Sequence, residues 1–185
     1  NEKECFTIGY VGRFSEGKGI EHIIEAAVLL KFKYRILLVG KGPLLEKLIL
    51  LVKQNKLDEN IQFIGAIPNN ELVNYYNKFD VFVFPTMRKA ESFGNVAIEA
   101  MACKIPIIGS KISGLNDYLK DNENGLFFPP GDYKMLAEKI TEFYELSTEE
   151  KEIMKENAYK TAIEYETDKL TKKFINKLSE IVDRN

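Results

Sequence analysis

The sequence predicts an α/β fold: a single Rossmann-like domain of three layers, with helices on both faces of a parallel sheet. Short β-branched or aromatic runs alternate with stretches whose apolar residues recur at helical spacing. Several of the short runs are almost continuously apolar, as expected for strands that are covered on both faces. Such alternation is typical of right-handed βαβ units, and 185 residues are sufficient for one domain with a substantial core.

Six strands and five helices are predicted before Pro129. The strands are expected at residues 6–11, 34–39, 61–64, 81–84, 105–109 and 125–128. The helices are expected at residues 19–31, 44–56, 70–78, 95–103 and 115–120.

From about residue 133 to its end, the chain is predicted to be a helical extension of the same domain. Asp132 is expected to cap a helix at residues 134–146. Ser147 and Glu150 fit the capping box of a second helix at residues 149–164. A last helix, at residues 167–182, carries its apolar side chains on one stripe, which suits docking against another domain.

Composition and charge exclude several classes of protein. The net charge of −2 argues against a nucleic-acid partner, because such a partner requires a strong positive field. Cys5 and Cys103 lie in or beside apolar runs, so we expect two buried thiols in a reducing compartment and no disulfide. No stretch approaches the ~18 apolar residues of a membrane span, and residues 1–5 do not resemble a signal peptide. We therefore expect a cytoplasmic protein, with a peripheral contact at the inner face of the membrane left open.

A glycine-rich turn that carries two cations follows the first predicted strand. Residues 12–18 have the spacing G-x-x-x-x-G-K of a phosphate-binding loop, but Gly19 stands where an NTPase has the Ser or Thr that binds magnesium. Asp80 precedes its strand and cannot complete such a metal site, which argues against an NTPase. Arg13 and Lys18 are still well placed for a phosphate, although solvated surface charges are the simpler explanation for this turn taken alone.

Two carboxylates bracket a predicted helix start further along the chain. Glu91 follows a strand at its carboxyl end, Gly94 allows a tight entry into the helix, and Glu99 lies about one turn later. The alternative is a solvated loop acid at Glu91 and an exposed helix residue at Glu99. However, Glu99 lies within an apolar run and needs a polar partner. Helix-start amides and cations suit a diphosphate, and carboxylates suit sugar hydroxyls, so together they predict a nucleotide-sugar site.

No metal or histidine chemistry is predicted. His22 lies beside Glu21 on the first helix, where a surface or capping role is expected. The spacing of His, Cys and Asp residues does not suggest a metal site, so we expect no bound metal and no cofactor.

Six segments of the chain form a recognisable series of motifs, and they are residues 9–19, 38–43, 61–65, 80–86, 91–99 and 124–132. In sequence and order they resemble the motifs of the C-terminal, nucleotide-sugar-binding domain of GT-B fold glycosyltransferases, specifically the retaining enzymes of the GT4 family. The resemblance covers roughly residues 6–140.

The resemblance implies roles for individual residues. Arg13 and Lys18 would bind the donor diphosphate and stabilise the departing nucleotide, and Glu91 would face the donor sugar, so these three are the expected catalytic residues. Glu99 would hold the ribose, and the base would lie near Ile64. The remaining donor contacts are expected from the backbone of the turn and the helix start, namely Gly12, Ser92, Phe93, Gly94, Asn95 and Val96.

The resemblance also implies an activity and a partner. The donor would be a UDP- or GDP-linked sugar, transferred without a metal to a glycan or glycolipid. The family often has Gly-Gly-x-x-Glu after the fifth strand, whereas this chain has Ser-Gly-Leu-Asn-Asp at residues 113–117. A whole GT-B enzyme has two Rossmann-like domains. We therefore expect that residues 1–185 lack the N-terminal acceptor domain and are inactive alone.

Two alternatives remain open from the sequence. The chain is compatible with a separate donor-binding subunit that needs a partner chain. It is also compatible with a protein of similar fold, such as a nucleotide-sugar epimerase or an oxidoreductase, although the dinucleotide fingerprint G-x-G-x-x-G is absent from the first turn.

Overall fold

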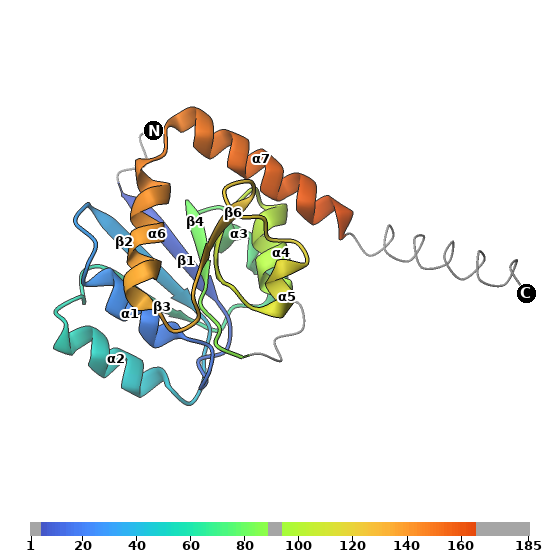
Figure 1. Ribbon diagram of the computed structural model, residues 1–185. Helices are drawn as coiled ribbons and strands as arrows, with labels where there is room; N and C mark the ends of the chain where they lie inside the picture. Colours follow the sequence, from blue (N-terminus) through green and yellow to red (C-terminus); the bar gives the residue numbers. More distant parts are fainter. Residues whose placement is uncertain (1–4, 89–93, 166–185) are drawn as a thin grey trace, which may run out of the picture.

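A computed structural model describes residues 5–88 and 94–165 of the chain. It has six parallel strands in the order β3-β2-β1-β4-β5-β6, with helices on both faces of the sheet (Figure 1). The strands are β1 (Phe6–Val11), β2 (Tyr34–Val39), β3 (Ile61–Gly65), β4 (Val81–Phe84), β5 (Ile107–Ser110) and β6 (Gly125–Phe128). The predicted three-layer α/β class is confirmed.

The strand order reverses between β1 and β4. The chain proceeds outward from β1 to β2 and β3 and then returns to place β4 on the other side of β1. β1 pairs with β2 along the full length of both strands, but with β4 only at Ile8–Val81 and Gly9–Phe82. In open α/β sheets, a crevice forms at such a reversal, outside the carboxyl ends of the strands.

Most of the predicted strand boundaries are confirmed, and the fifth strand is the exception. β1, β2, β4 and β6 have the predicted bounds, and β3 is one residue longer. The fifth strand was expected from residue 105 but begins at Ile107. Ile105 donates its amide to the carbonyl of Ala100 at the end of the preceding helix, and Pro106 has no amide to donate.

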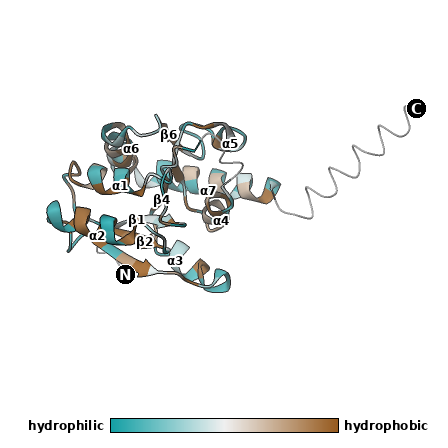
Figure 2. Cartoon of the chain, turned by 90° about the horizontal axis from the view of Figure 1, so that it is seen from below, coloured by the Kyte–Doolittle hydropathy of each residue, from teal (hydrophilic) through white to brown (hydrophobic). Residues whose placement is uncertain are grey.

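Two helical layers enclose the sheet. One face carries α1 (Ile20–Ala27), α2 (Leu45–Gln54) and α6 (Tyr133–Glu145), and the other carries η1 (Asn69–Glu71), α3 (Val73–Tyr76), α4 (Asn95–Ala102) and α5 (Ser113–Asn116). Figure 2 shows the same separation from below, with α1, α2 and α6 on one side of the strands and α3, α4 and α5 on the other. Each layer forms its own hydrophobic cluster against one face of the sheet.

Three helix predictions need correction. The helix expected at residues 19–31 ends at Ala27, because the amides of Leu29 and Leu30 bond three residues back. The single helix expected at residues 70–78 is a 3₁₀ turn, η1, followed by the short helix α3, because the amide of Leu72 bonds three residues back, to the Asn69 carbonyl. The helix expected at residues 115–120 is the single turn α5 at Ser113–Asn116. The helix expected at residues 167–182 lies outside the described residues.

The predicted caps of the last two described helices are confirmed. The Asp132 side chain accepts a hydrogen bond from the Met135 amide at the start of α6. At the start of α7 (Thr148–Glu164), the Ser147 hydroxyl accepts from the Glu150 amide, and the Glu150 carboxylate accepts from the Ser147 amide.

Helix α7 crosses the amino-end edge of the sheet from one face to the other (Figure 1). Met154 belongs to the first hydrophobic cluster, whereas Ala158 and Ala162 belong to the second. Lys104, just before β5, forms an ion pair with Glu156 on α7. The helix therefore leaves the opposite, carboxyl-end edge free for a site.

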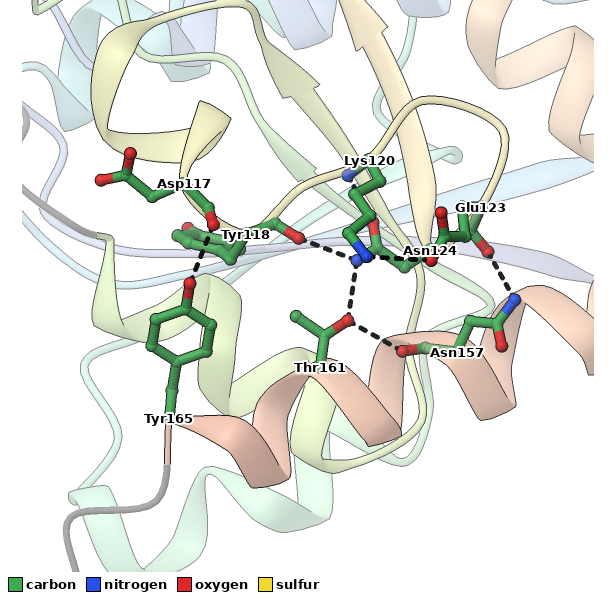
Figure 3. A network of polar contacts seen from close by, with 8 residues as sticks. All are labelled: Asp117, Tyr118, Lys120, Glu123, Asn124, Asn157, Thr161 and Tyr165. Atoms are coloured by element: carbon green, nitrogen blue, oxygen red, sulfur yellow. Dashed lines mark hydrogen bonds and ion pairs between the residues drawn. The ribbon is translucent and has the colours of Figure 1, made fainter. Parts of the chain in front are cut away.

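A polar network holds the second half of α7 in place (Figure 3). Asn124 is fully buried; its side chain accepts from the Lys120 amide and donates to the Tyr118 carbonyl and the Thr161 hydroxyl, all at 2.8–2.9 Å. At the end of α7, the Tyr165 hydroxyl donates to the Asp117 carbonyl at 2.8 Å. The network therefore joins α7 to the segment between α5 and β6.

The two cysteines are less buried than the sequence predicts. Cys5 and Cys103 are half-buried free thiols, not fully buried as expected, and Cys103 packs against the second hydrophobic cluster from its edge. Burial and the nearby Glu99 charge raise the pKa of Cys103.

Within the described residues, no helix combines the length and apolar character needed to cross a membrane.

Candidate functional site

The loops after β1 and β4 meet at the carboxyl-end edge, where the strand order reverses. A cavity of about 320 Å³ lies between them, and we call it the turn cavity. It is lined by Tyr10, Val11, Gly12, Arg13 and Lys18 from the β1 side, and by Phe84, Pro85, Thr86, Gly94, Asn95 and Val96 from the β4 side. The predicted cationic turn and the predicted helix start therefore share one cavity.

A second cavity of about 660 Å³ continues from the first toward β2 and β3, and we call it the edge cavity. The two share four lining residues: Val11, Gly12, Arg13 and Val96. The rest of its lining is Val39, Gly40, Lys41, Gly42, Ala66, Ile67, Asn69 and Leu72. Side by side, the two cavities provide a cationic part and a larger, mainly apolar part.

Gly19 allows the two loops to approach closely. It precedes α1 with a positive φ of 71°, and a Cβ at this position would lie 2.0 Å from the carbonyl oxygen of Pro85. Only glycine satisfies both conditions. The close approach brings the start of α1, with Lys18 just before it, against the loop that leads to α4.

Hydrogen bonds across the reversal fasten the same two loops together. The Met87 amide donates to the Gly17 carbonyl at 2.8 Å, and the Thr86 hydroxyl donates to the same oxygen at 3.2 Å. The Arg88 guanidinium donates to the Glu16 carbonyl at 2.6 and 3.1 Å and to the Ser15 hydroxyl at 3.2 Å. The Tyr10 hydroxyl donates to the carbonyl oxygen of Arg13 at 3.3 Å.

The electrostatics of the described lining favour an anion. Arg13 and Lys18 line the turn cavity, Arg13 and Lys41 line the edge cavity, and the described lining residues of both include no carboxylate. The first turn of α4 adds amides without intrahelical partners and the positive end of a helix dipole. This concentration of positive charge occurs in a chain whose net charge is −2. A phosphorylated ligand would therefore gain from several donors at once.

Glu99 lies one turn into α4, beyond the cavity lining. Val96, three residues earlier on the same helix, lines both cavities. The Glu99 carboxylate is exposed, and its Oε2 accepts a hydrogen bond from the buried Tyr76 hydroxyl at 2.8 Å. The polar partner expected for this carboxylate is thus Tyr76.

The structure brings together most of the predicted site residues that it describes. Gly12, Arg13, Lys18, Gly94, Asn95 and Val96 all line the turn cavity. Ile64 does not line either cavity; its side chain packs against the second hydrophobic cluster. Glu91, Ser92 and Phe93 lie outside the described residues, so their expected contacts stay predictions.

The sequence analysis missed a group of residues around the edge cavity. Ala66 and Ile67 line the edge cavity and Ile64 does not, because β3 extends to Gly65 and the chain reaches the cavity only after it. Lys41 follows β2, whose carboxyl end adjoins that of β1, so the strand order predicted by a Rossmann-like fold would have indicated it. Asn69 and Leu72 had no comparable signal.

Metal-binding groups are not gathered in the part of the chain that the structure describes. No cluster of three or more His, Cys, Asp or Glu side chains occurs there. His22, whose side chain is 15% exposed, contacts Glu25 through Nδ1 at 2.9 Å and the Met87 sulfur through Nε2 at 3.3 Å, so it lies less open to solvent than the expected surface role implies.

Fold and site together define a Rossmann-like domain with a cationic cavity at the strand-order reversal. The sequence model of the family described as "Glycosyl transferases group 1" matches residues 1–161. The chain therefore belongs to the group 1 glycosyltransferase family.

Individual relatives agree with this assignment. The chain is 38% identical over 145 residues to the capsular polysaccharide biosynthesis glycosyltransferase CapM of Staphylococcus aureus; the match covers 73% of this chain and 36% of CapM. The C-terminal domain of the group 1 glycosyl transferase LpcC from Francisella tularensis has 30% identity and a TM-score of 0.78, over 88% of this chain and 87% of that domain. The chain spans about a third of the length of the curated relatives it matches.

A more distant structure has the same fold. Anabaena HepE, solved in complex with UDP-glucose, is 24% identical with a TM-score of 0.83, over 96% of this chain and 49% of HepE. The six-stranded α/β domain thus matches C-terminal domains of GT-B glycosyltransferases.

Proposed function

We propose that this chain is the donor-binding domain of a retaining GT-B glycosyltransferase of the GT4 type. It binds a nucleotide-diphosphate sugar, and the enzyme transfers the sugar to a glycan or glycolipid. The observation that carries the proposal is that Arg13 and Lys18 share one cavity with the start of α4. Membership of the group 1 glycosyltransferase family favours a transferase over an epimerase or an oxidoreductase of similar fold.

The diphosphate of the donor occupies the turn cavity in this proposal. Arg13 and Lys18 bind its oxygens, and the amides of Asn95 and Val96 at the start of α4 add fixed dipoles. When the sugar–phosphate bond breaks, negative charge develops on the departing diphosphate, and these donors lower the barrier without having to reorient. Two fixed cations fill the role that a metal ion has in other transferases, which supports a metal-independent reaction.

The nucleoside occupies the edge cavity in the same proposal. Its base lies against Ala66 and Ile67, and its ribose approaches Glu99 past Val96. Glu91 faces the donor sugar, with backbone contacts from residues 92 and 93. UDP and GDP are the expected nucleotides.

A second domain supplies the acceptor site. The support is that the chain corresponds to about a third of the length of CapM and half of HepE. On this basis, the isolated chain binds nucleotide but does not transfer sugar. Polysaccharide biosynthesis as the pathway follows the name of CapM, and a cytoplasmic location is part of the proposal.

Nucleotide binding by the 185-residue chain tests the proposal. We expect calorimetric titration to detect binding of UDP, GDP or ADP, with UDP as the first probe because HepE was solved with UDP-glucose. Lys18→Ala should weaken binding by about 10- to 100-fold, the usual effect of losing a hydrogen bond between charged groups. Lys53→Ala, which removes an exposed lysine from α2, is the matched control and should change nothing.

Catalysis provides a second readout in the full-length enzyme. Loss of one pre-organised donor typically costs about 3 kcal/mol, so Lys18→Ala should lower turnover by about 100-fold or more. Failure of all three nucleotides to bind at millimolar concentration, or full activity of the Lys18 variant, would contradict the proposal.

A further inference from the structure

Tyr76 and Glu99 form a hydrogen-bonded pair about one helical turn from residues that line the edge cavity. Leu72 and Val96 line this cavity. Tyr76 lies one turn after Leu72, to whose carbonyl its amide bonds, and Glu99 lies one turn after Val96 on α4. The pair is therefore displaced by about one helical turn from the lining on both sides.

The two partners differ in their freedom to move. Tyr76 is 2% exposed and packs its ring against Phe79 and Phe82, with ring centroids 6.0 and 6.1 Å away. Glu99 is an exposed side chain, which has several rotatable bonds. The hydroxyl of Tyr76 is thus the fixed point, and the Glu99 carboxylate is held by it at 2.8 Å.

The Tyr76 hydroxyl remains a donor throughout the physiological pH range. Burial raises the pKa of Tyr76 strongly, and the hydrogen bond to Glu99 and the charge of that carboxylate raise it further. The phenol therefore keeps its proton. The bond runs from Tyr76 to Oε2 of Glu99, and Oε1 is left to accept hydrogen bonds from a ligand.

We infer that Tyr76 is a positioning residue that aims the Glu99 carboxylate at the ribose hydroxyls of the bound nucleotide. The inference rests on the proposed function, because it requires a nucleoside in the edge cavity. A carboxylate already held in one rotamer loses little further freedom when the ribose binds. Without the Tyr76 hydroxyl, the Glu99 side chain would become ordered only when the ligand binds, and the free energy needed to order it would weaken binding.

The inference concerns only the contact with the ribose hydroxyls, so a nucleotide that lacks these hydroxyls serves as the control ligand. In the 185-residue chain, Tyr76→Phe removes the hydroxyl and keeps the buried ring. We expect it to weaken binding of the best of UDP, GDP and ADP by about fivefold, which is the usual scale for one immobilised side chain. For the 2′,3′-dideoxy form of the same nucleotide, the unmodified chain and the variant should bind equally weakly.

Two control variants complete the experiment. Tyr75→Phe removes a hydroxyl one residue away, from a ring that contacts Lys78 and does not bond Glu99, and it should bind like the unmodified chain. Glu99→Ala, which removes every hydrogen-bonding group of this side chain, should lose the preference for the ribose over the dideoxy form, and adding Tyr76→Phe to it should have no further effect.

The outcomes separate this inference from the proposed function. If the unmodified chain binds none of the three nucleotides, the proposed function fails and the inference fails with it. If a nucleotide binds but Tyr76→Phe has no effect, or weakens the ribose and dideoxy forms equally, the inference alone is wrong. A loss confined to the ribose form supports both.

Discussion

The guanidinium of Arg88 donates two hydrogen bonds to the carbonyl oxygen of Glu16, 72 residues earlier in the chain. One comes from Nε at 3.1 Å and the other from Nη2 at 2.6 Å. Nη2 also donates to the Ser15 hydroxyl. This contact spans the reversal of strand order, where β1 and β4 share few paired residues. It fixes the loop that leads to α4 against the turn that carries Arg13 and Lys18.

Removal of this contact should weaken ligand binding with little effect on the fold. Arg88 is exposed, and Arg88→Met keeps an unbranched apolar stem while removing all the hydrogen-bond donors of the side chain. We expect nucleotide affinity to fall by about fivefold, because each lost hydrogen bond contributes about 1 kcal/mol to holding the two loops together.

Arg35→Met is the matched control for that measurement by calorimetry. Arg35 is also exposed and donates to the Thr7 hydroxyl at 2.8 Å, but at the amino-end edge of the sheet. Its substitution should leave nucleotide affinity unchanged. Equal losses in the two variants would show that the Arg88 contact has no special relation to the site.

Gly19 and Gly65 should respond differently to alanine. Both have positive φ, 71° and 86°, so each substitution strains the backbone by about 1–2 kcal/mol. At Gly65 an added Cβ meets nothing within 4 Å, whereas at Gly19 it would lie 2.0 Å from the Pro85 carbonyl oxygen. We expect Gly19→Ala to lower the free energy of unfolding by about 3 kcal/mol or more, measured by urea denaturation. Equal losses at the two positions would contradict the close approach of the loops.

Asn124 is expected to be a major stabiliser of the α7 attachment. Asn124→Ala would leave the Lys120 amide and the Tyr118 carbonyl without their side-chain partner, and it should lower the free energy of unfolding by about 2–3 kcal/mol. Asn157→Ala removes one exposed bond to the Glu123 carbonyl and should cost about 0.5 kcal/mol. Denaturation of both variants in urea checks the difference, and a comparable loss in the two would disprove the role of burial.

The capping box at the start of α7 should stabilise the fold only above acidic pH. Hydrogen bonds from the Ser147 side chain and then its backbone lower the pKa of Glu150 below its ordinary value of 4.5. A carboxyl whose pKa is lower in the folded state contributes stability above the unfolded value and loses it as the pH falls through the folded value. The difference in Tm between the unmodified chain and Glu150→Gln should thus be constant above about pH 5 and shrink at lower pH. A difference that persists unchanged to about pH 3 would refute this assignment.

The apolar pattern of the strands was sufficient to predict the sheet and its class. Runs such as Val81–Phe84 are buried on both faces, and only a strand in the middle of a three-layer fold needs that composition. The caps at Asp132 and Ser147 were predictable for a different reason: their hydrogen bonds are local and the residue types are specific. Local chemistry therefore predicted local structure well.

The site was only partly predictable. Gly12, Arg13 and Lys18 follow one strand, and Gly94 follows another, so the rule that ligands bind at carboxyl ends brings them together. The lining by Ala66 and Ile67 depends on where β3 ends, and Ile64, which still belongs to β3, packs half-buried against the second hydrophobic cluster. The contacts of Arg88 with Glu16 and of Tyr76 with Glu99 depend on tertiary packing, which periodicity does not encode.

The limited pairing between β1 and β4 has a thermodynamic consequence. β1 and β4 are neighbours in one continuous sheet but pair at only two positions, and the loops that follow these two strands line the turn cavity, where a phosphorylated ligand would bind. Occupancy would therefore act as a cross-link between the two loops, and by mass action it would stabilise the whole domain by about 2.7 kcal/mol at a ligand concentration 100 times the Kd. The contact between the two loops and the ligand affinity are linked reciprocally, so that a substitution that loosens this contact weakens binding even where it touches no ligand atom.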